Sequence, residues 1–216
     1  MFRNPERAMT ARLTIHSTLA AAVFLVAALP AQAGGDMVAG QTKAAACAAC
    51  HGANGNSASP AFPSLAGQSA GYLVKQLTEY KAGTRVNGIM AGMAAPLSAE
   101  DMDDMAAYYA AQAKTALPAE GQDAALLAQG GRLYHAGRPG AGVPACAACH
   151  GAKGFGHPGA GYPSLHAQQA MYVDGALKAF RDGARANDAG SVMRQAAKGL
   201  SDDDIRALAA YSASLR

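Results

Sequence analysis

One short motif occurs twice in this sequence and constrains the fold more than any other feature. The residues CAACHG at 47–52 recur at 146–151, a shift of 99 positions. The similarity continues past the motif, because PSL at 63–65 recurs at 163–165. A register that holds over so much of the chain predicts two copies of one small domain. It does not predict a solenoid, which needs three or more short repeats.

The motif itself predicts a chemistry. Cys-x-x-Cys-His is the attachment signature for c-type haem, in which two thiols form thioethers with the haem vinyl groups. The histidine that follows supplies one axial nitrogen to the iron. We therefore predict two covalently attached haem c groups, with iron bound by His51 and His150. The thioethers would use every cysteine in the chain, namely Cys47, Cys50, Cys146 and Cys149.

Three other uses of the cysteines explain the pattern less well. A single four-thiolate zinc site would leave both histidines without a use and would not require a duplication. Thioredoxin-like redox pairs need a βαβ context that the sequence lacks. Two disulfides, each spanning only two residues, would be labile bridges rather than structural ones.

The N-terminal segment has the pattern of a signal peptide. Three arginines precede an apolar run at 18–29, and the small-x-small triplet Ala31-Gln32-Ala33 follows Pro30. The apolar run is shorter than the roughly 20 residues that span a bilayer. We predict cleavage after residue 33 and a periplasmic protein, which suits haem attachment outside the cytoplasm. An uncleaved membrane anchor is the alternative.

Composition excludes several classes of protein. Half of the 216 residues are apolar, which indicates a folded chain rather than a disordered one. Removal of residues 1–33 would reduce the basic residues from 18 to 15 and the acidic residues from 15 to 14, leaving a charge of about +1. A charge this small does not indicate a nucleic-acid partner.

The pattern within each copy is helical, so the predicted fold class is all-α, with two tandem copies of one domain related by internal duplication. Asp36 can cap a helix that runs to about Ala46, and Ser69 can cap a second helix that ends at Gly83. Ser98 and Asp101 have capping-box spacing at the start of a third helix. Its apolar face has Met102, Met105, Ala106 and Tyr109 at helical spacing, and residues 201–209 repeat that design.

A proline- and glycine-containing stretch separates the two copies. This stretch, residues 115–123, predicts a linker between an N-terminal domain at 34–114 and a C-terminal domain at 124–216.

The second axial position of each iron needs another ligand, and methionine is usual in an electron carrier. The candidates are Met90 and Met93 in the first copy and Met193 in the second. Met90 and Met193 both lie seven residues before the repeated Leu-Ser pair, whereas Met93 aligns with Ala196. The repeat therefore favours Met90 and Met193 as ligands. Met93 is expected to line the core or the cavity, and Met102, Met105 and Met171 are expected in the core.

These features together resemble one family. The leader, the two motifs about 100 residues apart, FPSLAGQ at 62–68 and MAGM before Pro-Leu-Ser at 96–98 are similar to the di-haem cytochrome c4 family of periplasmic electron carriers. The resemblance covers the whole chain after the leader. It implies two class I cytochrome c domains related by a pseudo-two-fold axis, with the haems near each other at the interface.

The resemblance also implies site residues. Its ligand pairs correspond to His51 with Met90 and His150 with Met193. In such domains a proline carbonyl in the loop after the motif accepts the N–H of the iron-binding histidine, and Pro63 and Pro163 match that position. Such a bond would fix the imidazole tautomer and orientation. A simple loop turn is the alternative for both prolines.

The second copy departs from the first at several positions. It carries His157, and His166 where the first copy has Ala66, so either histidine could approach the second haem as a different ligand. Arg85 and Arg185 occupy matching positions. They could pair with haem propionates through their guanidinium forks or lie as solvated charges at a helix end.

Three functions are consistent with this pattern. The first is a non-enzymatic carrier that shuttles single electrons from a quinol-oxidising complex to a terminal oxidase or reductase. These partners dock transiently, and membrane contact is expected only through their complexes. The second is the cytochrome subunit of a flavocytochrome or another dehydrogenase. The third is a di-haem peroxidase, which needs one iron with an open position; a methionine candidate in both copies argues against it.

Overall fold

The computed structural model describes Met1, residues 34–116 and residues 123–216. The described residues from Gly34 onward belong to one compact unit. The predicted signal peptide beyond Met1 and residues 117–122 of the predicted linker lie outside the described residues. In the described part the fold is all-α, as predicted, and extended pairing is limited to two isolated bridges, Arg138–Val143 and His157–Tyr162.

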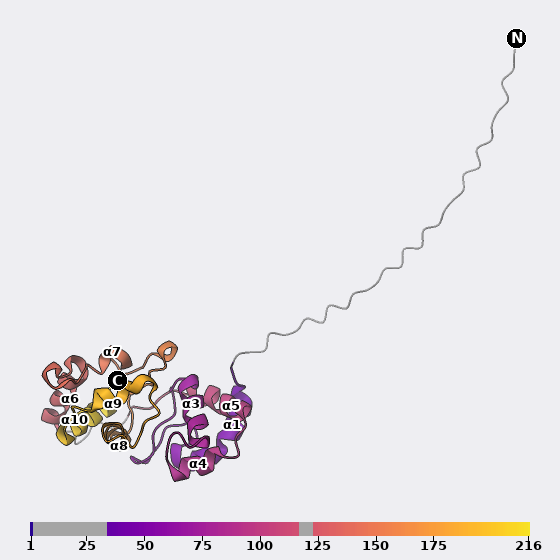
Figure 1. Ribbon diagram of the computed structural model, residues 1–216. Coiled ribbons are helices and arrows are strands. Elements are labelled where there is room, and N and C mark those ends of the chain that lie inside the picture. The colour runs from indigo at the N-terminus through magenta and orange to yellow at the C-terminus, as the bar shows by residue number, and fades with distance from the viewer. Residues whose placement is uncertain (2–33, 117–122) are drawn as a thin grey trace. The chain divides into compact units, whose positions relative to one another are not determined.

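The two halves repeat one arrangement of helices (Figure 1). The N-terminal half, residues 34–116, contains α1 (Met37–Lys43), η1 (Ala44–Cys47), α2 (Ala48–His51), α3 (Ala70–Lys81), α4 (Gly88–Ala94) and α5 (Ala99–Ala110). The C-terminal half, residues 123–216, contains α6 (Ala124–Ala136), η2 (Pro139–Ala141), α7 (Ala147–His150), η3 (Pro158–Ala160), α8 (Ala170–Arg181), η4 (Ala189–Ser191), α9 (Val192–Ala197) and α10 (Asp202–Ser214).

In each half the last helix packs against the first and the middle one. α5 contacts α1 and α3, and α10 contacts α6 and α8. Glycine permits the close crossing of the first and last helices. A Cβ atom on Gly40 would lie 2.0 Å from the carbonyl oxygen of Asp104, and one on Gly130 would lie 2.1 Å from that of Ala207.

The cores are small and lie between these helices. Met105 and Tyr109 of α5 are buried with Leu73 of α3 in the N-terminal half. Ile205 and Leu208 of α10 have the same role in the C-terminal half, where the full buried cluster is Leu133, Tyr134, Val143, Phe180, Ala197, Leu200, Ile205, Leu208 and Leu215. The apolar faces predicted for both terminal helices are therefore confirmed.

The helix ends follow the sequence closely. The capping box of Ser98 and Asp101 is present, and Ser201 and Asp204 form its counterpart on α10. Asp36 caps α1, but the α-helix ends at Lys43, earlier than predicted, and tightens into the 3₁₀ turn Ala44–Cys47.

Two further expectations need correction. Ser69 does occupy the N-cap of α3, yet its side chain makes no capping bond, and its backbone N–H donates to the Oε1 atom of Gln68 instead. Met171 is not in the core, as the sequence predicts, but is 59% exposed, because it lies on the outer face of the first turn of α8.

None of the helices in the described residues is both long and apolar enough to cross a membrane.

Candidate haem-binding site

Each motif folds into a single helical turn that directs the histidine inward. α2 and α7 both end at the motif histidine, and a glycine with positive φ follows each of them: Gly52 at +80° and Gly151 at +79°. A Cβ atom on Gly52 would lie 2.2 Å from the carbonyl oxygen of Asn56. The glycine after the histidine therefore lets the chain turn away immediately.

The four cysteines form no disulfides and are half-buried. Burial raises the pKa of the Cys47 thiol, and it raises that of Cys146 to about 11. The first cysteine of each pair is the N-cap of the short helix that ends at the histidine, and the second lies within that helix. This is the set of groups that covalent haem attachment requires.

Both motif histidines are buried and held by the predicted prolines. The Nδ1 atom of His51 lies 2.8 Å from the carbonyl oxygen of Pro63, and that of His150 lies 2.9 Å from the carbonyl of Pro163. A carbonyl only accepts, so Nδ1 carries the proton and donates, which leaves Nε2 as the free ligand nitrogen. Burial lowers the pKa of both histidines, against the opposing effect of the proline carbonyls, and so favours the neutral imidazole that binds a metal.

The methionine candidates lie on short helices after the middle helix of each half. Met90 is half-buried on α4, and its N–H donates to the Oδ1 atom of Asn87 at 2.9 Å. Met193 is half-buried on α9, where it packs against the C-terminal core. Met93 is 40% exposed, so the structure does not place it in the core. Iron ligation by Met90 and Met193 stays a prediction.

The other histidines of the second half have other contacts. The Nδ1 atom of His166 lies 3.2 Å from the carbonyl oxygen of Lys153, and its ring stacks on Phe155. His157 pairs with Tyr162 through its backbone and is exposed.

The two arginines at matching positions lie between the halves rather than as solvated charges. Arg85 stacks on Tyr80, and Arg185 stacks on Phe180. Each also reaches the other half: Arg85 donates to the hydroxyl of Tyr172 at 3.2 Å, and Arg185 donates to that of Tyr72 at 3.0 Å. The Oε1 atom of Gln76 accepts from both guanidinium groups. Pairing with haem propionates stays a prediction.

Two glutamines also lie at the interface between the halves. The repeat shows that they occupy matching positions, but it does not indicate their role. Gln68 and Gln168 match in the repeat, and both side chains are buried against the backbone of the opposite half. Such pairing joins residues about 100 positions apart, so only the folded chain reveals it.

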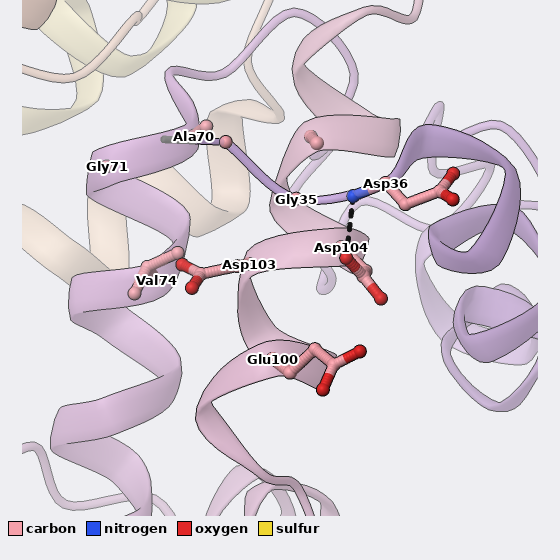
Figure 2. A pocket seen from close by; sticks show the side chains of 10 residues that line it. Gly35, Asp36, Ala70, Gly71, Val74, Glu100, Asp103 and Asp104 are labelled. Atoms are coloured by element: carbon pink, nitrogen blue, oxygen red, sulfur yellow. Dashed lines mark hydrogen bonds between the residues drawn. The ribbon is translucent and has the colours of Figure 1, made fainter. Parts of the chain in front are cut away.

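An open pocket of about 620 Å³ lies away from the motifs (Figure 2). Its carboxylates come from the segment before α1 and from α5, namely Asp36, Glu100, Asp103 and Asp104. Asp104 also accepts from the backbone N–H of Asp36, the bond drawn in Figure 2. None of the residues that line this pocket is a cysteine, histidine or methionine, so it is not the predicted haem site.

Comparison with known proteins places both halves in one family. The family model described as cytochrome c matches residues 37–111 and again 127–216. Cytochrome c4 of Pseudomonas aeruginosa is 46% identical, over 84% of this chain and 89% of that protein. The thiosulfate dehydrogenase electron acceptor of Stutzerimonas stutzeri is 40% identical, over 94% and 96%.

A solved structure agrees with this assignment. Reduced recombinant cytochrome c4 from Pseudomonas stutzeri superposes with a TM-score of 0.81 at 44% identity, covering 84% of this chain and all of the other. With one Cys-x-x-Cys-His motif in each matched domain, the chain carries two covalently attached haem c groups.

Proposed function

Because the chain belongs to the cytochrome c4 family and is a di-haem electron carrier rather than an enzyme, we propose that it shuttles single electrons in the periplasm. The donor would be a quinol-oxidising complex and the acceptor a terminal oxidase or reductase. Haem iron supplies the chemistry by changing between the ferric and ferrous states.

One observation carries this proposal. In both halves the histidine after the cysteines is buried and held by a proline carbonyl, which leaves its Nε2 atom free to bind iron. The same arrangement in both halves supports two similar histidine-bound irons, and the half-buried Met90 and Met193 at matching positions would fill the sixth position of each.

In each half, different residues would attach the haem, bind its iron and orient the histidine ligand. Cys47 and Cys50 anchor the first haem, and Cys146 and Cys149 the second. His51 with Met90, and His150 with Met193, complete the two iron coordination spheres. Pro63 and Pro163 hold the imidazoles in one tautomer and orientation, so that the ligands move little when an electron arrives or leaves.

The domain boundaries fit the same proposal. A leader at 1–33 would send the chain to the periplasm. The domains at 34–114 and 124–216 would then each hold one haem, joined by the linker at 115–123. Partners would dock transiently on each domain through small interfaces. With a charge of about +1 after cleavage, strong electrostatic steering is not expected.

A second candidate function is the electron-accepting partner or subunit of a periplasmic dehydrogenase. The observation that favours it is the 40% identical relative named as a thiosulfate dehydrogenase electron acceptor, which matches almost the whole chain. The two functions need the same haem sites and differ only in the donor.

Reduction assays separate the two. Oxidised holoprotein is added to native membranes supplied with a quinol, and separately to the native periplasmic fraction supplied with thiosulfate. The shuttle predicts rapid reduction in the first assay, lost when the quinol-oxidising complex is inhibited. Rapid reduction in the second assay alone would favour the dehydrogenase partner, and no reduction in either would contradict both.

A further inference from the structure

Two glutamine side chains join the halves in a reciprocal pattern. Gln168 of the C-terminal half accepts from the backbone N–H of Ser64 at 2.8 Å and donates to its carbonyl at 2.9 Å. Gln68 of the N-terminal half does the same to Ser164, at 2.9 and 3.0 Å. Gln68 and Gln168 are 5% and 3% exposed, so these amide pairs are shielded from water.

Each glutamine contacts the same peptide group as a motif histidine. The N–H of Ser64 and the carbonyl of Pro63 belong to one peptide unit. Its oxygen accepts from Nδ1 of His51, while its N–H donates to Gln168. The peptide between Pro163 and Ser164 likewise links His150 to Gln68.

We infer that Gln168 and Gln68 are positioning residues for the iron of the opposite half. Gln168 acts on the iron held by His51, and Gln68 acts on the iron held by His150. This inference rests on the histidine ligation in the proposed function. It gives each half a specific influence on the redox centre of the other.

The direction of the effect follows from hydrogen-bond cooperativity. When the peptide N–H donates to the glutamine, the peptide polarises and its carbonyl oxygen becomes a stronger acceptor. A stronger bond from Nδ1 makes the imidazole more basic toward the iron. A more basic ligand favours the ferric state, so each glutamine lowers the reduction potential of the opposite haem.

The chain supplies a matched control beside one of these residues. Gln169 is 7% exposed and also crosses between the halves, but its Nε2 atom donates to the carbonyl of Ser57 at 2.7 Å. It makes no bond to the Pro63–Ser64 peptide among the contacts of the described residues. Gln169→Met therefore removes an interface bond but keeps the hydrogen bonds that link Gln168, the Pro63–Ser64 peptide and His51, which we call the glutamine relay.

The test uses the mature di-haem holoprotein. Proton–nitrogen NMR of the ferrous protein reports the Nδ1–H resonances of His51 and His150, and voltammetry reports the two potentials. In Gln168→Met we expect the His51 resonance to move upfield, as its hydrogen bond weakens, and one potential to rise. The His150 resonance stays in place. In Gln68→Met the His150 resonance should move upfield and the His51 resonance should stay in place. In Gln169→Met neither resonance should move.

A second variant distinguishes two effects of Gln168→Met: the loss of the oxygen that accepts from Ser64, and a general loosening of the contact between the halves. Gln168→Glu keeps an oxygen that can accept from Ser64 but loses the donor, so the His51 resonance should remain at or downfield of its native position. Hydrogen exchange at the Ser64 amide should accelerate on the order of tenfold in Gln168→Met and not in Gln169→Met.

Several results would overturn the inference. Shifts confined to the histidine in the same half as the substitution would do so, as would equal shifts in both halves or no shift at all. A one-dimensional proton spectrum of the same ferrous sample checks the proposed ligands, because an iron-bound methionine shows a strongly upfield methyl signal. Missing methyl signals would contradict the methionine ligation, while unmoved Nδ1–H resonances beside intact methyl signals would contradict only the glutamine relay.

Discussion

Replacing Gly130 by alanine tests the close crossing of α6 and α10. A Cβ atom there would lie 2.1 Å from the carbonyl oxygen of Ala207 and 2.7 Å from the Cβ atom of Tyr211. Ordinary contacts begin at 3.4 Å, so the two helices would have to separate by roughly 1 Å. Neither neighbouring atom is at the end of a flexible side chain, so neither can swing aside.

The magnitude comes from two opposing terms. Overpacking of this kind costs about 1–3 kcal/mol, and rigid neighbours place this position at or above the upper end. Alanine regains up to about 1 kcal/mol in a helix interior. We expect Gly130→Ala to be about 2 kcal/mol less stable, which lowers the melting temperature of a domain this size by about 10 °C.

Gly175→Ala on α8 is the matched control, because a Cβ atom there would have no neighbour within 4 Å. It should gain about 0.5–1 kcal/mol through helix propensity alone. Both variants are measured as holoproteins by guanidinium unfolding, followed by circular dichroism. A Gly130→Ala protein as stable as the native chain would refute the argument that glycine is required by the crossing.

Two further predictions concern the ligands and acid stability. Met90→Leu should abolish the ferric methionine–iron absorption band of one haem, whereas Met93→Leu should leave it intact; the reverse result would assign the ligand to Met93. Asp204→Asn should cost about 2 kcal/mol at neutral pH, because the 2.7 Å ion pair with Arg138 is lost. Burial alone would raise the pKa of Asp204, but its bonds to Ser201 and Arg138 lower it below 3.8. The native chain therefore loses this stabilisation as the pH falls below about 3.8. The difference in unfolding free energy between the native chain and Asp204→Asn should narrow there, as measured by unfolding at a series of pH values. A difference that stays constant would contradict the lowered pKa of Asp204.

Local signals predicted most of the fold. The pairing of Ser98 with Asp101 indicated the start of α5, because a capping box depends only on residues three positions apart. The apolar spacing of Met102 and Met105 indicated its buried face for the same reason. The prediction for Met171 is wrong, since one methionine on a helix does not reveal which side meets the core.

The site residues also differ in whether local sequence could predict them. The four haem-attachment cysteines could be assigned from sequence, because the attachment motif is contiguous, and iron ligation by His51 and His150 is predicted from the same motif. The prolines needed the family resemblance, and the structure confirms that their carbonyls meet His51 and His150. The contacts of Gln168 could not be predicted, because its partner Ser64 is 104 residues away along the chain. Arg85 likewise finds its tyrosine partner 87 residues away, in the other half.

We propose that both irons are bound by one histidine and one methionine. The far-red absorption of the ferric holoprotein, normalised to total haem by the pyridine haemochrome assay, tests it most directly. Methionine sulfur on ferric haem gives a weak charge-transfer band there, and an open or bis-histidine iron gives none. We predict two equivalents of the band for two haems. One equivalent would mean that one iron is open or has two histidine ligands, and it would contradict the account of two equivalent carrier sites.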